Sequence, residues 1–319
     1  MIDDWTSSTG AEIELAGRAT QSSITNHQSS IHRLDSRAPS SVGRRARLEL
    51  AFEQRAGRTI LARAYAEPPF RIGHAFDVDG AAYVILVCAS PGIFAGDRFD
   101  TRVTVGPGAR VLLASQSSLQ VHPGHDCEPA IVSSEFHVAG DGELHCLWDP
   151  IIPFAQARLI QRLDLDLAQD SRLYWSDALM SGRTSRGESW EFAVLDHELR
   201  VTIGGTLGYL ERYRLAPNET ATGSIGPAGS TQRWIAGAAH YIGTILTHHP
   251  DLTTTLAERL HDSLAAQDGV QGAVDLVEPE LMVGRVLGAN GAAFLRARSA
   301  LRAAVLDTIF GNPRLVARR

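Results

Sequence analysis

The chain has 319 residues, of which 44% are hydrophobic and 21% charged, and its formal net charge is −6. A chain of this length buries a sizeable core as one large domain or two ordinary ones. The acidic balance gives no electrostatic footprint for nucleic acid, and no run of apolar residues is long enough to cross a membrane. Three cysteines without CxxC spacing and an acidic N-terminus without an apolar segment predict a protein of the reducing cytoplasm.

Residues 1–43 are rich in Ser and Thr, with two Gln and one Asn, and show little hydrophobic periodicity. A segment of this composition buries too little apolar surface to offset the entropy lost when it is ordered. We therefore expect residues 1–43 to form a disordered or loosely attached tail, and residues 44–319 to form the folded domain.

Short strands with turn residues between them follow the tail. In the first of them, apolar Leu48, Leu50 and Phe52 alternate with other side chains, as expected of a strand with one buried face. Gly, Pro and Asp separate the further runs, at 59–65, 82–89, 98–105, 111–114, 131–138, 143–148 and 159–167. Strands that recur about every 8 to 12 residues with turn signals between them indicate an all-β fold.

Helical spacing appears only near the C-terminus. Leucines recur at i+4 intervals over 252–264 after a predicted N-cap at Asp251, and apolar residues recur over 294–309 after Asn290. Gly311 is predicted to end the second helix. The predicted fold is therefore all-β, with about two C-terminal helices.

An acid stands on the apolar face of the predicted strand 207–215. Because side chains alternate along a strand, Glu211 shares its face with Tyr209 and Tyr213 and should point to the interior. A buried carboxylate must be paired, hydrated or protonated. Glu211 either pairs with an internal Arg or accepts a Tyr hydroxyl proton, or it belongs to a functional polar interior.

Two further acids raise the same question. Asp177 lies in 173–179 among aromatic and apolar residues, and Asp97 follows a Gly-rich corner at the end of a buried strand. Three acids next to apolar strands fit a wet internal passage, and they also fit ordinary salt bridges.

Six segments resemble, in chain order, the blocks of one known family, the urease accessory protein UreD, which is called UreH in some organisms. The similarity runs from about residue 44 to the C-terminus. The segments are 90–98, 149–158, 175–188, 210–212, 285–288 and 313–314. The chain departs from the family pattern at Ala95, which stands in a usual Gly position, at 114–116 and at Leu315.

This resemblance implies an elongated, β-solenoid-like stack of strands with two helices near the C-terminus. It also implies a scaffold and not a catalyst, with no catalytic residues. The expected partners are a UreF protein, the GTPase UreG that docks through UreF, and the urease apoenzyme. Ni²⁺ would be cargo in transit through a polar tunnel, and no cofactor would be bound permanently.

The resemblance places Asp97, Asp177 and Glu211 along that internal path as transient nickel sites. Ni²⁺ accepts oxygen and imidazole ligands, and a conduit needs weak successive sites instead of one tight cage. The inward position of Glu211 would thereby acquire a functional reason.

Charged residues in the same blocks are candidates for the tunnel mouth or for partner contacts. Arg183 and Glu188 lie within the family motif, Arg186 lies between them, and Arg98 follows the Gly-Asp corner. The alternative is an exposed charge network that adds little stability.

Histidines suggest a tighter metal site as an alternative. His122, His125 and Cys127 place potential ligands within six residues, although a polar surface turn explains the same pattern. His248 and His249 lie in a predicted loop, where solvated histidines are expected.

Two other function classes remain open. Asp97 and Glu211 could act as general acid and base on a glycan in a β-rich enzyme. The tryptophans could instead form a stacking platform in a carbohydrate-binding or other ligand-binding protein, although Trp in a β-core more often packs. The sequence contains no GxSxG, HExxH, P-loop or Rossmann fingerprint.

The second predicted helix carries three arginines, Arg296, Arg298 and Arg302, which we place opposite its apolar stripe. Such a face is either solvated or available to a partner.

Overall fold

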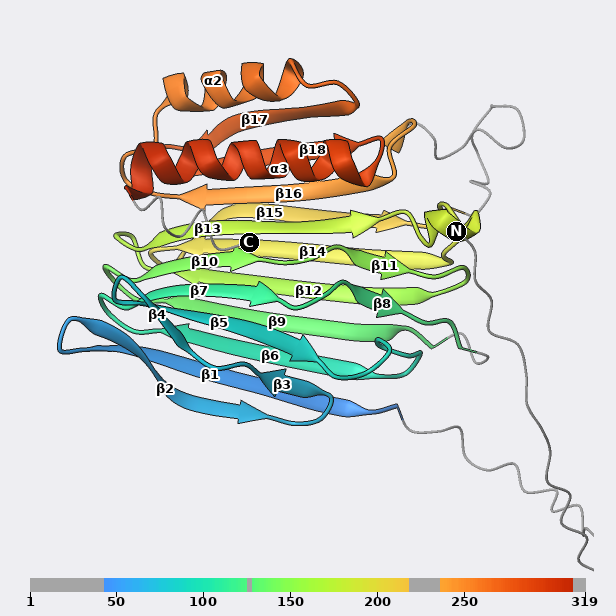
Figure 1. The fold of residues 1–319 in the computed structure, drawn as a ribbon, viewed down its shortest axis with the longest axis horizontal. Coiled ribbons are helices and arrows are strands. Elements are labelled where there is room, and N and C mark those ends of the chain that lie inside the picture. Colours follow the sequence, from blue (N-terminus) through green and yellow to red (C-terminus); the bar gives the residue numbers. More distant parts are fainter. Residues whose placement is uncertain (1–42, 125–127, 218–235, 312–319) are drawn as a thin grey trace, which may run out of the picture. The chain divides into compact units, whose positions relative to one another are not determined.

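The computed structural model describes residues 43–124, 128–217 and 236–311 (Figure 1). Two β-sheets face each other across the core. Sheet A contains, in spatial order, β15 (Thr206–Leu215), β14 (Val194–Ile203), β12 (Arg158–Leu167), β9 (Ala130–Val138), β6 (Arg98–Val105), β1 (Arg45–Arg55) and β2 (Arg58–Ala66).

Sheet B extends further than sheet A at the C-terminal end of the stack. Its main path contains, in spatial order, β17 (Val270–Glu278), β18 (Leu281–Gly288), β16 (Tyr241–His248), β13 (Arg172–Met180), β10 (Glu143–Leu147), β7 (Arg110–Ser115), β5 (Ala81–Cys88) and β3 (Phe70–Ile72). Three short strands lie off this path, namely β4 (Phe76–Val78), β8 (Leu119–Val121) and β11 (Ile151–Pro153).

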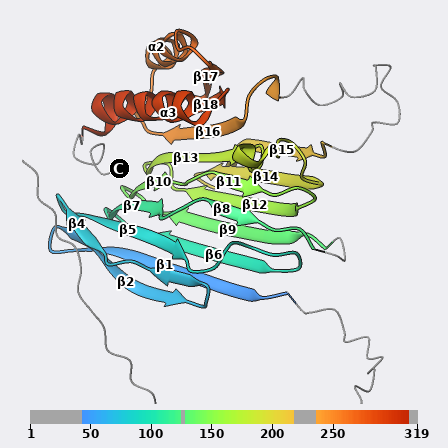
Figure 2. The ribbon, with the colours of Figure 1, turned by 45° about the vertical axis from the view of Figure 1, so that its right-hand side comes forward.

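The middle of the chain winds as a β-solenoid of about 4 turns. From β5 to β14 the long strands alternate between the sheets, so that each new strand pairs in parallel with the strand one turn earlier (Figure 2). Arg98 of β6 pairs with Ile131 of β9, for example, and Ile131 pairs with Ile160 of β12. The predicted all-β stack is confirmed.

The stack ends in antiparallel strands and two helices. β15 returns along β14, and β16, β18 and β17 extend sheet B with antiparallel pairings. Helices α2 (Thr254–Ala265) and α3 (Gly291–Val305) cover the outer face of this part of sheet B, and α3 runs on into a π-helical turn, η2 (Leu306–Phe310) (Figure 1). Within the described residues these are the two α-helices, as predicted.

The N-cap predicted from the sequence is confirmed at α3 but not at α2. Asn290 caps α3 through its side chain, which accepts a hydrogen bond from the Ala293 N–H at 2.9 Å, and Gly311 follows η2 with a left-handed conformation. At α2 the predicted cap, Asp251, was wrong. Thr253 caps that helix because its hydroxyl is placed to accept from the Leu256 N–H.

The space between the sheets holds most of the apolar side chains that alternate along the strands. Leu48, Leu50 and Phe52 are buried there, as the alternation predicts. Simple alternation predicts that Leu207, Tyr209 and Glu211 all point inward on β15. Tyr209 and Glu211 do, but Leu207 is 52% exposed. A bulge opposite Val201 and Thr202 shifts the register before that point, and side chains change faces where the register shifts.

Two arginines of α3 correct the prediction of a solvated charged face. Arg296 is exposed, but Arg298 and Arg302 are only 6% and 7% exposed. Both lie in the row that packs on sheet B, because they follow Phe294 by four and eight positions on the helix. The two histidines predicted to be solvated, His248 and His249, are also buried.

The predicted tail, residues 1–43, lies outside the described residues except for Gly43. None of the helices in 43–124, 128–217 and 236–311 has the length and apolar character needed to cross a bilayer.

Candidate functional site

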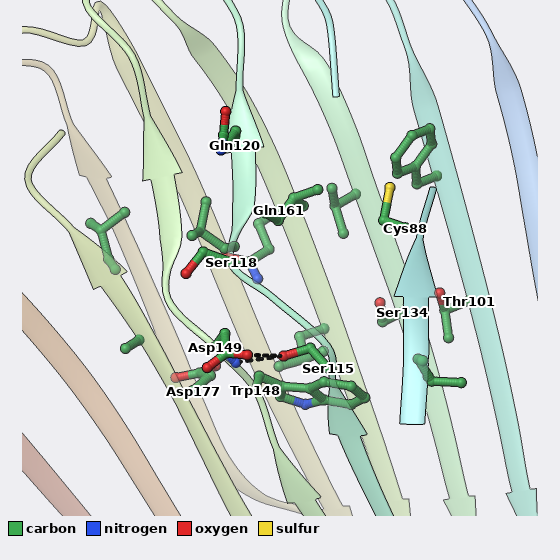
Figure 3. Close-up of a pocket in the computed structure, with 18 of the residues that line it drawn as sticks. Cys88, Thr101, Ser115, Ser118, Gln120, Ser134, Trp148, Asp149, Gln161 and Asp177 are labelled. Carbon is green, nitrogen blue, oxygen red and sulfur yellow. Dashed lines mark hydrogen bonds between the residues drawn. The ribbon is translucent and has the colours of Figure 1, made fainter. Parts of the chain in front are cut away.

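A cavity of about 440 Å³ lies between the two sheets. Apolar side chains form much of its wall, and the polar ones come from both sheets. Figure 3 shows Asp149 and Asp177 on one side of the view, and Cys88 and Thr101 on the other. The polar lining residues include Thr101, Ser134, Gln161, His197 and Tyr213 of sheet A, Ser115, Gln120, Asp177 and Thr244 of sheet B, and Ser118 and Asp149 of the connecting segments.

Asp177 is the predicted acid that lines this cavity. It lies on β13 directly opposite Thr244 of β16, and Thr244 lies opposite Arg285 of β18. Its carboxylate accepts a hydrogen bond of 3.1 Å from the indole N–H of Trp175, two residues earlier on the same face. Asp177 thus adds a negative charge to a row of inward polar side chains.

Glu211 lies at the end of that row and comes from the opposite sheet. Its carboxylate forms an ion pair with Arg285 and accepts a 3.0 Å hydrogen bond from the Tyr209 hydroxyl. Arg285 in turn donates to the Thr244 hydroxyl and, at 3.0 Å, to Tyr209. The prediction that Glu211 points inward and pairs with an Arg or a Tyr hydroxyl is confirmed for both partners.

The row therefore joins the two sheets beside the cavity. Asp177, Thr244 and Arg285 follow one another across sheet B, and Glu211 completes the row from β15 of sheet A. Two of the three predicted acids are brought to one region. The sequence did not reveal Arg285 as the partner, although it lies in one of the segments that carry the family resemblance.

A neutral histidine completes this region. Burial lowers the pKa of the His197 imidazole to about 4. The ring stacks on Tyr213 with centroids 4.6 Å apart, and its Nδ1 lies 3.0 Å from the Gln161 side-chain oxygen. At neutral pH its Nε2, 3.8 Å from Glu211, therefore makes no ion pair, and the imidazole is a neutral polar group of the cavity wall.

Asp149 is an acid of the cavity wall that sequence reasoning missed. It follows β10 at the point where the chain leaves sheet B, and its backbone N–H donates to the Ser115 hydroxyl at 2.7 Å. The Ser115 hydroxyl also lies 3.1 Å from the Asp149 carboxylate, to which it donates (Figure 3). Pro150 was the available signal, because a proline ends a central strand and turns the residue before it off the sheet.

Asp97 does not line the cavity. Its two carboxylate oxygens accept hydrogen bonds from the backbone N–H groups of Arg44, at 2.7 Å, and Phe94, at 3.0 Å. Gly96 takes the left-handed position of the turn that Asp97 closes, with φ of 80°. Ala95, the departure from the family pattern, is not among the positive-φ residues, so the turn tolerates its side chain.

The motif arginine and glutamate form a partly buried pair at one edge of the solenoid. Arg183 and Glu188 are joined by an ion pair and by a hydrogen bond of 2.8 Å from Nε, and the guanidinium lies 4.0 Å above the Phe154 ring. Arg186 is exposed beside them, and with Arg183 it lines a surface hollow. Arg98 lies elsewhere, exposed on sheet A, and its Nε donates to Asp100 at 2.9 Å.

The alternative metal cluster is described only at His122. The ring stacks on Phe94 with centroids 4.4 Å apart, and Nε2 lies 3.1 Å from the Pro91 carbonyl oxygen. His125 and Cys127 lie outside the described residues. Among the residues that the structure describes, no group of three or more His, Cys, Asp or Glu side chains is placed to hold a metal ion.

The geometry does not support the proposed acid and base of a glycosidase. Asp97 precedes β6 and Glu211 lies on β15, and β14, β12 and β9 stand between these strands. At roughly 4.8 Å per strand the separation is about 19 Å, whereas paired glycosidase carboxylates lie within about 10 Å of each other. Trp148 and Trp175 pack edge-on in the core, with centroids 5.8 Å apart, and so form no open stacking platform.

The fold and the site define an all-β class of protein, a two-sheet solenoid with a cavity between its sheets whose largely apolar wall carries two acids, Asp149 and Asp177. The sequence profile of the UreD urease accessory protein matches residues 44–319. The chain therefore belongs to the UreD family of urease accessory proteins.

Individual relatives agree with this assignment. The urease accessory protein UreD 2 of Streptomyces griseus is 30% identical over 289 residues, covering 88% of this chain and 95% of its own. UreD of Deinococcus radiodurans is also 30% identical, over 88% of this chain and 98% of its own. UreH of Helicobacter pylori is 25% identical over 79% of this chain and 91% of its own.

Proposed function

We propose that this chain is a scaffold in urease maturation and that Ni²⁺ passes through its cavity to the nascent urease active site. The observation that carries the proposal is the position of Asp177 in the cavity wall. Within the described residues its carboxylate accepts one hydrogen bond, from Trp175, so oxygen lone pairs remain for a cation. A single carboxylate with water binds Ni²⁺ weakly, as a transfer site requires.

Glu211 is the second acid of the proposed path. Because Arg285 holds its carboxylate, a cation would bind there only by displacing the guanidinium, and that exchange keeps the site weak. The place of Asp97 in the path stays a prediction, and its two backbone hydrogen bonds favour a structural role instead.

The partners in this proposal are a UreF-like protein, a UreG-like GTPase reached through UreF, and the urease apoenzyme. The proposal is supported by the family, whose members are named urease accessory proteins. The exposed Arg186 beside the Arg183–Glu188 pair is a candidate contact for one of these partners. We place the protein in the cytoplasm, where the free thiols of Cys88 and Cys146 stay reduced.

Nickel content of urease tests the proposed path. The chain is co-expressed with the cognate urease and its other accessory proteins, and nickel per purified urease is measured for the wild type and for Asp177→Ala. We expect Asp177→Ala to lower nickel content about tenfold, as when one transfer site is lost. Asp164→Ala, which removes an exposed acid of β12, is the matched control and should leave nickel content unchanged. If urease matured with Asp177→Ala contained as much nickel as urease matured with the wild type, the proposal would be wrong.

Co-purification tests the partners separately. The chain is expressed with and without the cognate UreF-like protein and analysed by size-exclusion chromatography. A stable complex that also forms with Asp177→Ala is expected. A chain that elutes alone in the presence of the UreF-like protein contradicts the scaffold role.

A further inference from the structure

Arg298 of α3 is buried against the back of the wall that carries the cavity acids. It is 6% exposed, and no charged or polar side chain was expected in the helix row that packs on sheet B. A buried guanidinium is costly unless its donors are satisfied. Its hydrogen bonds therefore indicate what the side chain holds in place.

Those hydrogen bonds reach two strands of sheet B. The Nε of Arg298 donates to the Ser176 hydroxyl at 2.5 Å, and Nη2 donates to the carbonyl oxygens of Trp148, at 2.6 Å, and Ser176, at 2.7 Å. Ser176 directly precedes Asp177, and Trp148 directly precedes Asp149. The guanidinium thus donates hydrogen bonds to the backbone directly before Asp149 and Asp177, the two acids of the cavity wall.

The position of this contact matters because the strand pairing is interrupted there. The register of β10 with β13 ends where Leu147 lies opposite Ser176, and pairing with β13 resumes only at Ile151, opposite Leu179. Between these points the chain bends away from the sheet and carries Asp149 into the cavity wall. The Trp148 N–H still donates to the Ser176 carbonyl at 2.9 Å, and Arg298 supplies the donor for the Trp148 carbonyl, from which the bend starts.

We propose that Arg298 is a positioning residue that fixes the Asp149 bend and the adjacent Asp177 segment, and so sets the arrangement of the cavity carboxylates from the helix side. A guanidinium suits this task because its planar fork reaches two carbonyls and a hydroxyl at once. A lysine offers the charge without the fork. The positioning role itself does not require nickel, but its consequence for nickel transfer rests on the proposed function.

Carboxyl labelling tests the positioning role without nickel. The full-length chain, in its complex with the cognate UreF-like protein if it needs one, is treated with a carbodiimide and an amine, and labelling of individual acids is followed by mass spectrometry. Arg298→Met fills the same space without donors. We expect it to raise the labelling rates of Asp149 and Asp177 about tenfold, because the bend opens locally more often. Labelling of exposed Asp164 should not change.

The matched control is Arg296→Met, two residues away and thus about half a turn round the same helix, on its exposed side. It should leave the labelling of Asp149 and Asp177 at the wild-type rate. If Arg298→Met does not fold, Arg298→Lys is the deciding variant, and it is expected to raise labelling in the same way because it lacks the fork. Wild-type labelling of both acids in a folded Arg298 variant overturns the inference.

Nickel content separates this inference from the proposed function. If both hold, Arg298→Met lowers nickel per urease about as far as Asp177→Ala does, whereas Arg296→Met does not. If labelling responds to Arg298→Met while Asp177→Ala leaves nickel content unchanged, the positioning role is supported and the nickel path fails. If Asp177→Ala lowers nickel per urease while Arg298→Met leaves the labelling rates of Asp149 and Asp177 unchanged, the nickel path is supported and the positioning role is wrong.

Discussion

The corner at Asp97 and the cavity at Asp177 show how differently one folded chain uses two inward acids. Both follow apolar stretches in the sequence, and both were predicted to line an internal path. In the corner, two backbone N–H groups occupy both oxygens of the Asp97 carboxylate. In the cavity, the described residues supply one donor to Asp177, from the Trp175 side chain.

The difference is between a carboxylate held by the backbone through both oxygens and one that meets a single side-chain donor in a cavity wall, as the proposed cation contact requires. A carboxylate that satisfies backbone donors replaces hydrogen bonds of regular secondary structure, and its loss leaves those donors unpaired. A carboxylate beside an open volume loses little contact when it is neutralised, but it is free to bind a cation. Glu211 lies between these cases, because an arginine from the opposite sheet neutralises it.

The largest stability effect is expected at the corner. Asp97→Ala leaves the Arg44 and Phe94 N–H groups without their acceptor, which should lower the free energy of unfolding by about 3 kcal/mol, as expected for hydrogen bonds to a charged group. Urea unfolding measures the change. Asp97→Asn, which keeps one acceptor oxygen, should lose less. A stability loss below about 0.5 kcal/mol in Asp97→Ala would show that the corner does not depend on the carboxylate.

The bridge between Glu211 and Arg285 should give the next largest effect. Glu211→Gln leaves Arg285 without its counter-ion and should cost about 2 kcal/mol, less than a fully buried pair would, because a third of the Arg285 side chain is exposed. Arg285→Met in the same background should restore part of that loss. A double-mutant cycle by urea unfolding measures the coupling, and strictly additive losses would show that the pair contributes no interaction of its own.

The pH dependence of stability should reflect the buried histidine of the cavity wall. Burial lowers the pKa of His197 to about 4, whereas the unfolded chain binds this proton near pH 6.5. The unfolded state therefore holds more protons between these values, and stability falls as the pH drops through that window. Burial also lowers the pKa values of His248 and His249, which act in the same direction.

His197→Asn tests this contribution, since its amide can still donate toward Gln161. Between about pH 7 and about pH 5.5 the variant should lose about 1 kcal/mol less stability than the wild type. Urea unfolding midpoints at the two pH values provide the measurement. An equal loss in both proteins would show that His197 is not the group that titrates.

The smallest stability effect is expected at the cavity acid. Asp177→Asn keeps an acceptor for the Trp175 indole, so its free energy of unfolding should lie within about 0.5 kcal/mol of the wild type. Thermal and urea unfolding of Asp177→Asn, measured beside Asp97→Asn, compare the contributions of the two acids to stability. If Asp177→Asn were the more destabilising of the two, the assignment of structural and ligand-facing roles would be reversed.

Local pattern was enough to predict the strands, the helices and the inward direction of Glu211. Each of these follows from a period of two or of about four residues that faces one core. The same reasoning failed at Leu207, where a bulge moved the register, and at Arg298. The helix period contained the signal for Arg298, which lies in the row of Phe294 and Leu301, but its charge led to the opposite interpretation.

Order and periodicity along the chain were sufficient to predict the family, the all-β stack and the inward direction of Glu211, because each of these depends on local spacing. The partners of Asp97 and Glu211, in contrast, include residues from distant parts of the chain, which only the tertiary structure brings together. Asp97 accepts a hydrogen bond from the backbone N–H of Arg44, 53 positions earlier in the chain. Arg298 donates one to the carbonyl oxygen of Trp148, 150 positions earlier. Such partners meet only when the turns of the solenoid stack and α3 packs on sheet B, since no local period connects them.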